Sequence, residues 1–240
     1  MDELEELILN SAAKINIKLD KNMLKQFKEY KTLLLEWNKR INLTSILDEK
    51  EIILKHFIDS ISVLNNIKID DNASIIDVGT GAGFPGIPIK IVKPNYNITL
   101  LDSLNKRVKF LNTAIEKLEL NNINTIHGRA EVLGREDSLR EKFDIAVSRA
   151  VSNLSTLCEY TLPFVKVGGC FISFKGPNVK EEIECASNSI NALGGRVNDI
   201  IFVNIPETDI KHSLIVITKV SQTCIKYPRS TSKIKRNPIL

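Results

Sequence analysis

The sequence lacks the features that place a protein in a membrane, in an oxidising compartment or around a metal ion. No apolar run approaches the roughly 20 residues that a membrane-spanning helix needs. The N-terminal sequence Met-Asp-Glu-Leu-Glu-Glu is acidic, whereas a signal peptide begins with basic residues. The 4 cysteines have no CxxC or other close spacing, which predicts free thiols in a reducing compartment and no zinc site. We therefore expect a cytoplasmic protein with no membrane partner and no metal.

The composition is that of an ordinary globular protein. Of the 240 residues, 43% are hydrophobic and 26% are charged, which is enough apolar material for a sizeable core. The formal net charge of +4 permits nucleic-acid binding without requiring it, so the position of the charges matters more than their sum. From Ile225 to the end the chain has basic residues and no acid, which makes this tail a candidate for phosphate contacts. The candidate residues are Arg229, Lys233, Lys235 and Arg236.

The spacing of the apolar residues divides the chain into a helical part and a mixed part. Up to about residue 66 they recur at helical spacing, as Leu24, Phe27 and Tyr30 do. Beyond that point short β-rich segments alternate with helical ones, which predicts an α/β protein with a parallel, doubly wound sheet. The predicted strands are Ser74–Val78, Ile98–Leu101, Asn124–His127, Phe143–Val147, Cys170–Phe174, Val197–Val203 and Leu214–Lys219. The last two lie so close together that one of them is expected to be antiparallel.

This division predicts an N-terminal helical extension (1–68), a Rossmann-type domain (69–222) and a basic C-terminal tail (223–240). The strongest local motif lies at the start of the Rossmann-type domain. The strand that includes Asp77 runs into Gly79-Thr80-Gly81-Ala82-Gly83-Phe84-Pro85-Gly86 and then into an apolar segment. Glycine lets the backbone turn sharply and approach a ligand without a Cβ atom in the way. A plain strand-to-helix turn needs fewer glycines than this loop contains. The loop therefore predicts a nucleotide-like ligand.

Two kinds of ligand fit this loop. The segment from Gly81 to Gly86 satisfies GxGxxG, so a nicotinamide or flavin dinucleotide is the obvious alternative. Asp77, just before the first glycine, is unfavourable next to a pyrophosphate but favourable next to the ammonium and sulfonium of S-adenosylmethionine. Pro85 also removes a backbone donor that a phosphate would use. The loop therefore favours the methyl donor, while Asp102, at the end of the second strand, suits the ribose hydroxyls of either ligand.

The loop after the fourth strand, Ser148-Arg149-Ala150-Val151, indicates the kind of methyl transfer. It is not the Asn/Asp-Pro-Pro-aromatic loop of amino-nitrogen methylation, and no Pro-Cys pair supplies the nucleophile for carbon-5 methylation. Guanine N7 has a free lone pair, so its methylation needs positioning and no general base. Arg149 is the positioning candidate, either towards the cofactor or as a donor to guanine O6. An oxygen methyltransferase that uses a lysine stays open.

The sequence resembles the bacterial small-subunit rRNA guanine-N7 methyltransferase family (RsmG, also called glucose-inhibited division protein B), nearly from end to end. The matching segments include Asn42-Leu43-Thr44, His56-Phe57-Ile58-Asp59-Ser60, Gly83-Phe84-Pro85-Gly86, Arg129-Ala130-Glu131, Ser148-Arg149-Ala150, Lys175-Gly176 and Tyr227-Pro228-Arg229. The resemblance implies a Rossmann-type class I S-adenosylmethionine-dependent methyltransferase sheet. It also implies methyl transfer to N7 of one guanine in the decoding-region hairpin of 16S rRNA, with the small ribosomal subunit or an assembly intermediate as partner.

By the same match the cofactor-binding residues are Gly79, Phe84, Asp102, Ala130, Glu131 and Arg149. Lys175 joins the tail residues as an RNA-binding candidate, while His56 and Asp59 match family positions without an assigned role. The alternatives that remain are a methyltransferase for another RNA, a small molecule or a protein, a dinucleotide oxidoreductase, and a non-catalytic RNA-binding protein. The basic tail and Lys106, Arg107 and Lys109 favour RNA over a small molecule.

Overall fold

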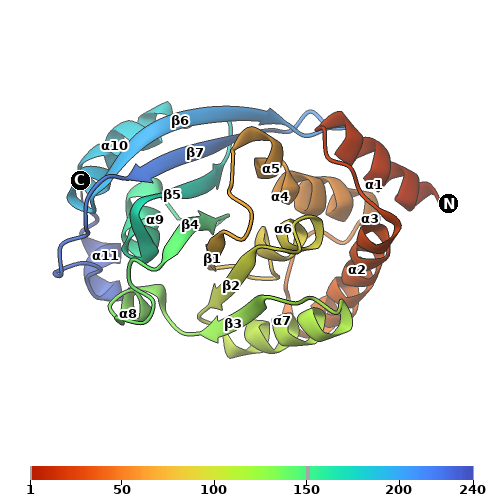
Figure 1. Cartoon of the computed structure of the whole chain (residues 1–240), viewed down its shortest axis with the longest axis horizontal. Helices are drawn as coiled ribbons and strands as arrows, with labels where there is room; N and C mark the ends of the chain where they lie inside the picture. The colour runs from red at the N-terminus through yellow and green to blue at the C-terminus, as the bar shows by residue number, and fades with distance from the viewer. Residues whose placement is uncertain (1, 150–151, 240) are drawn as a thin grey trace.

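The structure is a computed structural model that describes residues 2–149 and 152–239. Its centre is a seven-stranded sheet in the order β3-β2-β1-β4-β5-β7-β6 (Figure 1). The strands are β1 (Ser74–Val78), β2 (Asn97–Asp102), β3 (Ile123–His127), β4 (Phe143–Ser148), β5 (Val165–Lys175), β6 (Gly195–Asn204) and β7 (Lys211–Lys219). The predicted α/β fold and its predicted strands are confirmed.

Strand direction decides which residues meet at the edge of the sheet. β1 to β5 pair in parallel, because helical connections carry the chain back across the sheet between them. β6 and β7 are joined by a short loop, and β7 is antiparallel to both of its neighbours. The beginning of β7 therefore lies at the edge where the parallel strands end, with Ser213 paired to Lys175.

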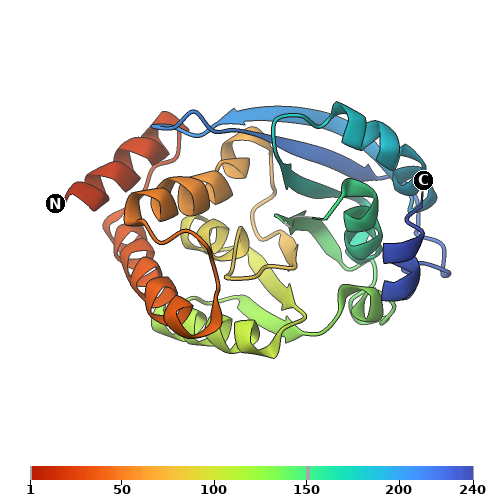
Figure 2. The same cartoon turned by 180° about the vertical axis from the view of Figure 1, so that it is seen from behind.

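Helices cover both faces of the sheet, as the two opposite views show (Figures 1 and 2). One face carries the N-terminal helices together with α6 and α7, and the other carries α8, α9 and α10. The N-terminal helices are α1 (Glu3–Lys14), α2 (Lys21–Ile41), α3 (Glu49–Ile52), the π-helix η1 (Ile53–Ile58), α4 (Asp59–Ile61) and α5 (Val63–Asn66). The others are α6 (Gly86–Val92), α7 (Asn105–Lys117), α8 (Ala130–Leu133), α9 (Leu154–Thr161), the 3-10 helix η2 (Leu162–Phe164), α10 (Lys180–Ala192) and α11 (Thr231–Arg236).

The N-terminal helices share a hydrophobic core with the sheet. α2 begins at the capping side chain of Asp20, and Phe27 and Tyr30 on its buried face pack against Phe57 of η1. The hydroxyl of Tyr30 donates a hydrogen bond to the Ala82 carbonyl in the glycine loop. The extension therefore fixes the position of η1 beside that loop. Within the described residues no helix combines the length and apolar character that crossing a bilayer requires.

The C-terminal segment is held against the sheet domain by arginines. The guanidinium of Arg135 donates to the carbonyls of Lys226 and Pro228, and that of Arg140 donates to those of Thr223 and Tyr227. Burial of Ile234 then seats the short helix α11 next to α9. The tail therefore has a defined path that leads back to the carboxyl end of the sheet.

Candidate active site

The glycine loop presents bare backbone at the carboxyl end of β1. Gly79 and Gly81 have φ angles of +74° and +63°, a region that L side chains rarely adopt. A Cβ atom on Gly79 would meet nothing within 4 Å, so this glycine leaves open space beside the loop. Gly86 serves packing instead, because a Cβ there would lie 2.4 Å from Cδ2 of Leu100.

Asp77 stabilises the conformation of this loop through hydrogen bonds. Its Oδ2 accepts hydrogen bonds from the Thr80 hydroxyl at 2.6 Å and from the Gly86 N–H at 2.8 Å. Burial raises the pKa of the Asp77 carboxyl to about 7. Because the side chain is fully buried and lines neither of the cavities described below, it holds the loop in shape. From the sequence we expected the charge of Asp77 to act directly on the ligand, whereas the buried carboxyl group instead stabilises the loop.

Two cavities are lined in part by residues of the loop. Cavity A, of about 340 Å³, lies over the ends of β1, β2 and β3. It is lined by Val78, Gly79, Leu101, Asp102, Ser103, Arg107, Gly128, Arg129, Ala130, Glu131, Ser152, Leu157, Tyr160, Thr231 and Lys235. Its volume lies within the roughly 300–1,000 Å³ of small-molecule sites. Four of the six residues predicted to bind the cofactor, Gly79, Asp102, Ala130 and Glu131, meet here.

Asp102 is held rigidly in cavity A. Its Oδ2 accepts from the Gly81 N–H at 2.9 Å and its Oδ1 from the Leu104 N–H at 2.8 Å. Arg107 approaches Oδ2 at 3.4 Å, and its buried Nε has no hydrogen-bond partner among the described residues. A carboxylate offers about four acceptor positions, so Asp102 still has capacity for ligand hydroxyls.

Glu131 lies at the other side of cavity A, where the C-terminal helix reaches it. Its carboxylate accepts a hydrogen bond from the Thr231 hydroxyl, while Arg129 donates to Thr231 Oγ1 at 3.2 Å. Lys235 of α11 lines the same cavity. The tail therefore forms part of this wall, which the sequence pattern did not indicate.

Cavity B, of about 640 Å³, adjoins cavity A through Gly79 and Arg107, which line both. Phe84 and Arg149, the other two predicted cofactor residues, line cavity B and not cavity A. The other residues that line cavity B are Leu43, Thr44, Ser45, Ile46, Lys55, His56, Asp59, Thr80, Gly81, Ala82, Ile210 and His212. Of the loop Ser148–Val151, Ala150 and Val151 lie outside the described residues.

Arg149 is tied to the N-terminal extension. Its Nη1 donates to Asp59 Oδ2 at 2.9 Å and to the Lys55 carbonyl at 3.0 Å, and its Nη2 lies 3.0 Å from His56 Nδ1. The guanidinium also lies 4.9 Å from the ring centre of Phe84, a cation–π distance. These contacts connect the end of β4 to η1 and α4, so the extension completes the wall of cavity B.

His56 is kept neutral in this arrangement. Burial, and then the nearby charge of Arg149, lower the pKa of its imidazole to about 3. The ring stacks on Phe84 with centroids 4.5 Å apart, and Nε2 lies 2.8 Å from the Thr44 hydroxyl. Since arginine can only donate, His56 Nδ1 accepts and Nε2 carries the hydrogen. His56 is therefore a structural and polar wall of cavity B, with no capacity to take up a proton near neutral pH.

A model of the rRNA small subunit methyltransferase G family (GidB) matches residues 23–211. The chain is 53% identical over 233 residues to "Ribosomal RNA small subunit methyltransferase G" of Clostridium botulinum (strain ATCC 19397 / Type A), covering 97% of this chain and 98% of the relative. It is 53% identical over 243 residues to the protein of the same name from Acetivibrio thermocellus, with both chains covered completely. The chain belongs to the rRNA small subunit methyltransferase G family.

Solved structures agree with this family in fold. A precorrin-6y C5,15-methyltransferase from Geobacter metallireducens GS-15 superposes with a TM-score of 0.51 at 17% identity, over 67% of this chain and 87% of that one. A SAM-dependent methyltransferase from Aquifex aeolicus gives a TM-score of 0.51 at 18% identity, over 71% and 93% of the two chains. The predicted class of enzyme, an S-adenosylmethionine-dependent rRNA methyltransferase, is confirmed by the family.

The residues of cavity A fit S-adenosylmethionine. The bare backbone of Gly79 and Gly81 permits close approach, and Asp102 and Glu131 supply acceptors for ribose hydroxyls and an amino group. No pyrophosphate has to be accommodated, which suits two carboxylates in one cavity. Among the residues that the structure describes, no three His, Cys, Asp or Glu side chains gather as metal ligands would.

The predicted RNA-binding residues fall into two groups in this family member. Lys233, Lys235 and Arg236 are exposed on α11 beside cavity A. Arg229 instead pairs with the buried carboxylate of Glu159 at 2.7 Å. Lys175, at the end of β5, donates to Glu182 Oε1 and to the Ser152 carbonyl, each at 2.6 Å.

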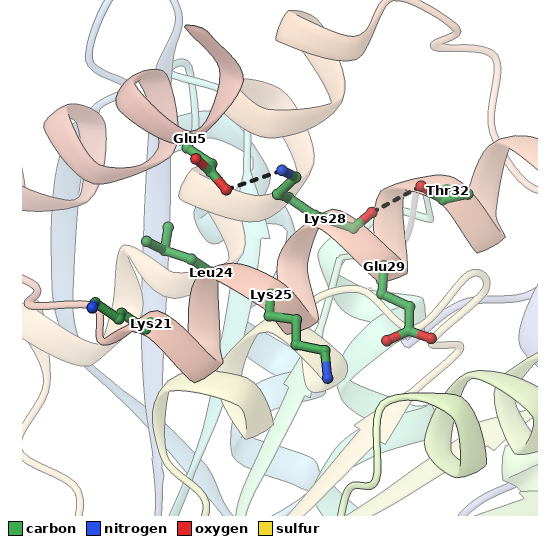
Figure 3. A pocket seen from close by; sticks show the side chains of 7 residues that line it. All are labelled: Glu5, Lys21, Leu24, Lys25, Lys28, Glu29 and Thr32. Carbon is green, nitrogen blue, oxygen red and sulfur yellow. Dashed lines mark hydrogen bonds and ion pairs between the residues drawn. The ribbon is translucent and has the colours of Figure 1, made fainter. Parts of the chain in front are cut away.

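A further cavity lies between α1 and α2, in the N-terminal part of the chain. It measures about 620 Å³ and is lined by Glu5, Lys21, Leu24, Lys25, Lys28, Glu29 and Thr32. Figure 3 shows Lys28 pointing to Glu5, to which it is ion-paired at 2.9 Å. It shares no lining residue with cavity A or cavity B, so it is separate from the candidate active site.

Proposed function

We propose that this enzyme transfers the methyl group of S-adenosylmethionine to N7 of one guanine in the decoding-region hairpin of 16S rRNA. The observation that carries the proposal is that cavities A and B share the bare backbone of Gly79. A cofactor in cavity A and a base in cavity B would then meet at this glycine. S-adenosylmethionine supplies the reactive methyl group when it is bound, and the chain supplies the positions of the two partners.

Cavity A is the proposed cofactor site. Asp102 is proposed to accept from the ribose hydroxyls, and two backbone N–H groups that donate to its oxygens support this by fixing its orientation. Ala130 and Glu131, which follow β3, are proposed to contact the adenine. Phe84 and Arg149 are proposed to act from the side of cavity B, where they close the space next to the glycine loop.

Cavity B is the proposed site of the acceptor base. Guanine N7 has a free lone pair, so no proton has to leave before the methyl group is transferred. With a pKa lowered to about 3, His56 is a poor base near neutral pH, and Arg149 stays charged and paired with Asp59, so neither side chain is available as a base. This chemistry matches a cavity whose walls hold and orient a flat ring.

We further propose that the basic tail (223–240) binds rRNA next to the methyltransferase domain (69–222), while the helical extension (1–68) completes the wall of cavity B. The exposed cations Lys233, Lys235 and Arg236 are proposed to contact phosphates, while Arg229 and Lys175 act on protein structure through Glu159 and Glu182. The partner would be 16S rRNA in the small subunit or an assembly intermediate, and the compartment would be the cytoplasm.

The test is to supply the protein and S-adenosylmethionine to small subunits that lack the modification. N7-methylguanine is cationic, and borohydride followed by aniline cuts the RNA chain at it. We expect primer extension to show one treatment-dependent stop in 16S rRNA, present only when enzyme and methyl donor are both supplied. Incorporation of labelled methyl groups without chain cleavage would place the methyl group on another atom and refute the proposal.

A further inference from the structure

Asp59 joins three distant segments at cavity B. Its carboxylate is 1% exposed and contacts Arg149 through Oδ2 at 2.9 Å. Its Oδ1 lies 2.6 Å from Nδ1 of His212, a residue 153 positions later in the chain. Since β7 is antiparallel to its neighbours, its second residue, His212, comes to lie at the edge where β1 and β4 end. The family match ends one residue earlier, at position 211.

This contact decides which nitrogen of His212 faces the cavity. A carboxylate can only accept, so Nδ1 of His212 carries the hydrogen and donates it to Asp59. In the neutral ring Nε2 is then a hydrogen-bond acceptor. Within residues 2–149 and 152–239, Nε2 of His212 has no hydrogen-bond partner, and the side chain, 28% exposed, lines cavity B.

The opposite kind of group also lines the cavity. Thr44 Oγ1 accepts hydrogen bonds from His56 Nε2 and from the Ile46 N–H at 3.1 Å. The hydroxyl hydrogen of Thr44 is therefore available for donation to another group. The lining of cavity B therefore includes an acceptor at His212, when its ring is neutral, and a donor at Thr44. The N1–H donor and O6 acceptor of guanine lie side by side, whereas adenine has an acceptor at N1 and a donor at N6.

We propose that His212, oriented by Asp59, recognises the methyl-accepting guanine by accepting a hydrogen bond from its N1–H. This assignment rests on the proposed function, because it names the contact that selects the base in cavity B. His212 is a positioning and specificity residue: it holds the edge of the ring remote from N7 and rejects adenine, whose N1 would face it acceptor to acceptor.

Two substitutions separate this role from a purely structural one. His212→Asn places an amide donor near the position of Nδ1, which keeps the bond to Asp59 but removes the distal acceptor. His212→Gln places an amide oxygen near the position of Nε2, which keeps the distal acceptor. Each full-length variant would be compared with the unsubstituted enzyme on small subunits lacking the modification. The measurements are kcat/KM for subunits, S-adenosylhomocysteine affinity by calorimetry and resistance to urea.

We expect His212→Asn to lower kcat/KM by about 10- to 100-fold, as the loss of one base contact does. His212→Gln should recover most of this loss, and S-adenosylhomocysteine affinity should be unchanged in both variants. An active Asn variant with an impaired Gln variant would show that His212 only braces Asp59. Equal loss in both variants would show that the acceptor is not what matters. Either result overturns the inference alone, whereas an unsubstituted enzyme that forms no N7-methylguanine overturns the proposed function itself.

Discussion

The C-terminal tail contains two kinds of cation, and the structure predicts different effects for them. Lys233, Lys235 and Arg236 are exposed on α11, and no acidic side chain of the described residues is ion-paired to them. Each phosphate contact releases counterions, which lowers the slope of log K against log salt by roughly 0.7–0.9. Replacing all three with glutamine should therefore flatten the slope of rRNA binding by roughly 2–3 units.

Arg229 serves as the matched control in the same segment. Its side chain is 23% exposed, whereas that of Glu159 is 1% exposed, and the contacts between them include the Arg229 backbone N–H at 2.7 Å. Arg229→Gln would leave a buried carboxylate without its cation. Breaking a buried pair costs about 3–5 kcal/mol, and the partial exposure of Arg229 favours the lower end. This variant should lose stability and keep the salt slope.

The assay is binding of a 16S rRNA fragment at several salt concentrations, with urea unfolding and S-adenosylhomocysteine calorimetry on the same samples. Calorimetry is required because Lys235 lines cavity A and its loss must not be mistaken for a cofactor effect. An unchanged slope in the triple variant would show that α11 is only a solvated segment. A flattened slope in Arg229→Gln, with unchanged stability, would refute the division of the tail into two groups.

Three further predictions follow from the glycine loop and its surroundings. Asp102→Ala should weaken S-adenosylhomocysteine binding by about 1.5–3 kcal/mol, because hydrogen bonds to a charged group contribute about this much. An unchanged affinity in calorimetry would contradict this. Burial raises the pKa of Asp77 to about 7 and lowers that of His56 to about 3. Between about pH 4 and 6.5, Asp77 is therefore protonated in the folded protein and ionised in the unfolded chain, whereas His56 is neutral in the folded protein and protonated in the unfolded chain. Each of these opposing effects changes the free energy of unfolding by at most about 1.4 kcal/mol per pH unit. Relative to the unsubstituted protein, the free energy of unfolding should therefore rise more with pH in Asp77→Asn and less in His56→Gln. Denaturant titrations across this range would refute the two pKa directions if both variants kept the original slope. Gly86→Ala should destabilise the protein by about 1–3 kcal/mol, because the new methyl group would overlap Leu100. An unchanged free energy of unfolding in urea would contradict this.

The sequence alone was sufficient to predict the strands of the sheet and to predict that the candidate cofactor residues gather at one edge of it. Hydrophobic spacing predicted the strands because each buried strand has to present apolar side chains to the helices on both faces. The gathering of these candidate residues followed from chain order, since the carboxyl ends of parallel strands meet at one edge. Gly79, Asp102, Ala130 and Glu131 therefore line one cavity although they come from three different strand ends.

The tertiary structure decided which partner each polar side chain finds. Asp77 turned out to hold the loop, and Arg229 pairs with a glutamate 70 residues away, contacts that local spacing does not encode. His212 stayed unnoticed in the sequence, because a single histidine at the start of a strand carries no motif. Its meeting with Asp59 depends on the reversed direction of β7 and on the packing of the N-terminal helices against the sheet. Strand direction and long-range packing place side chains that no local pattern connects, because these contacts exist only once the whole core has formed.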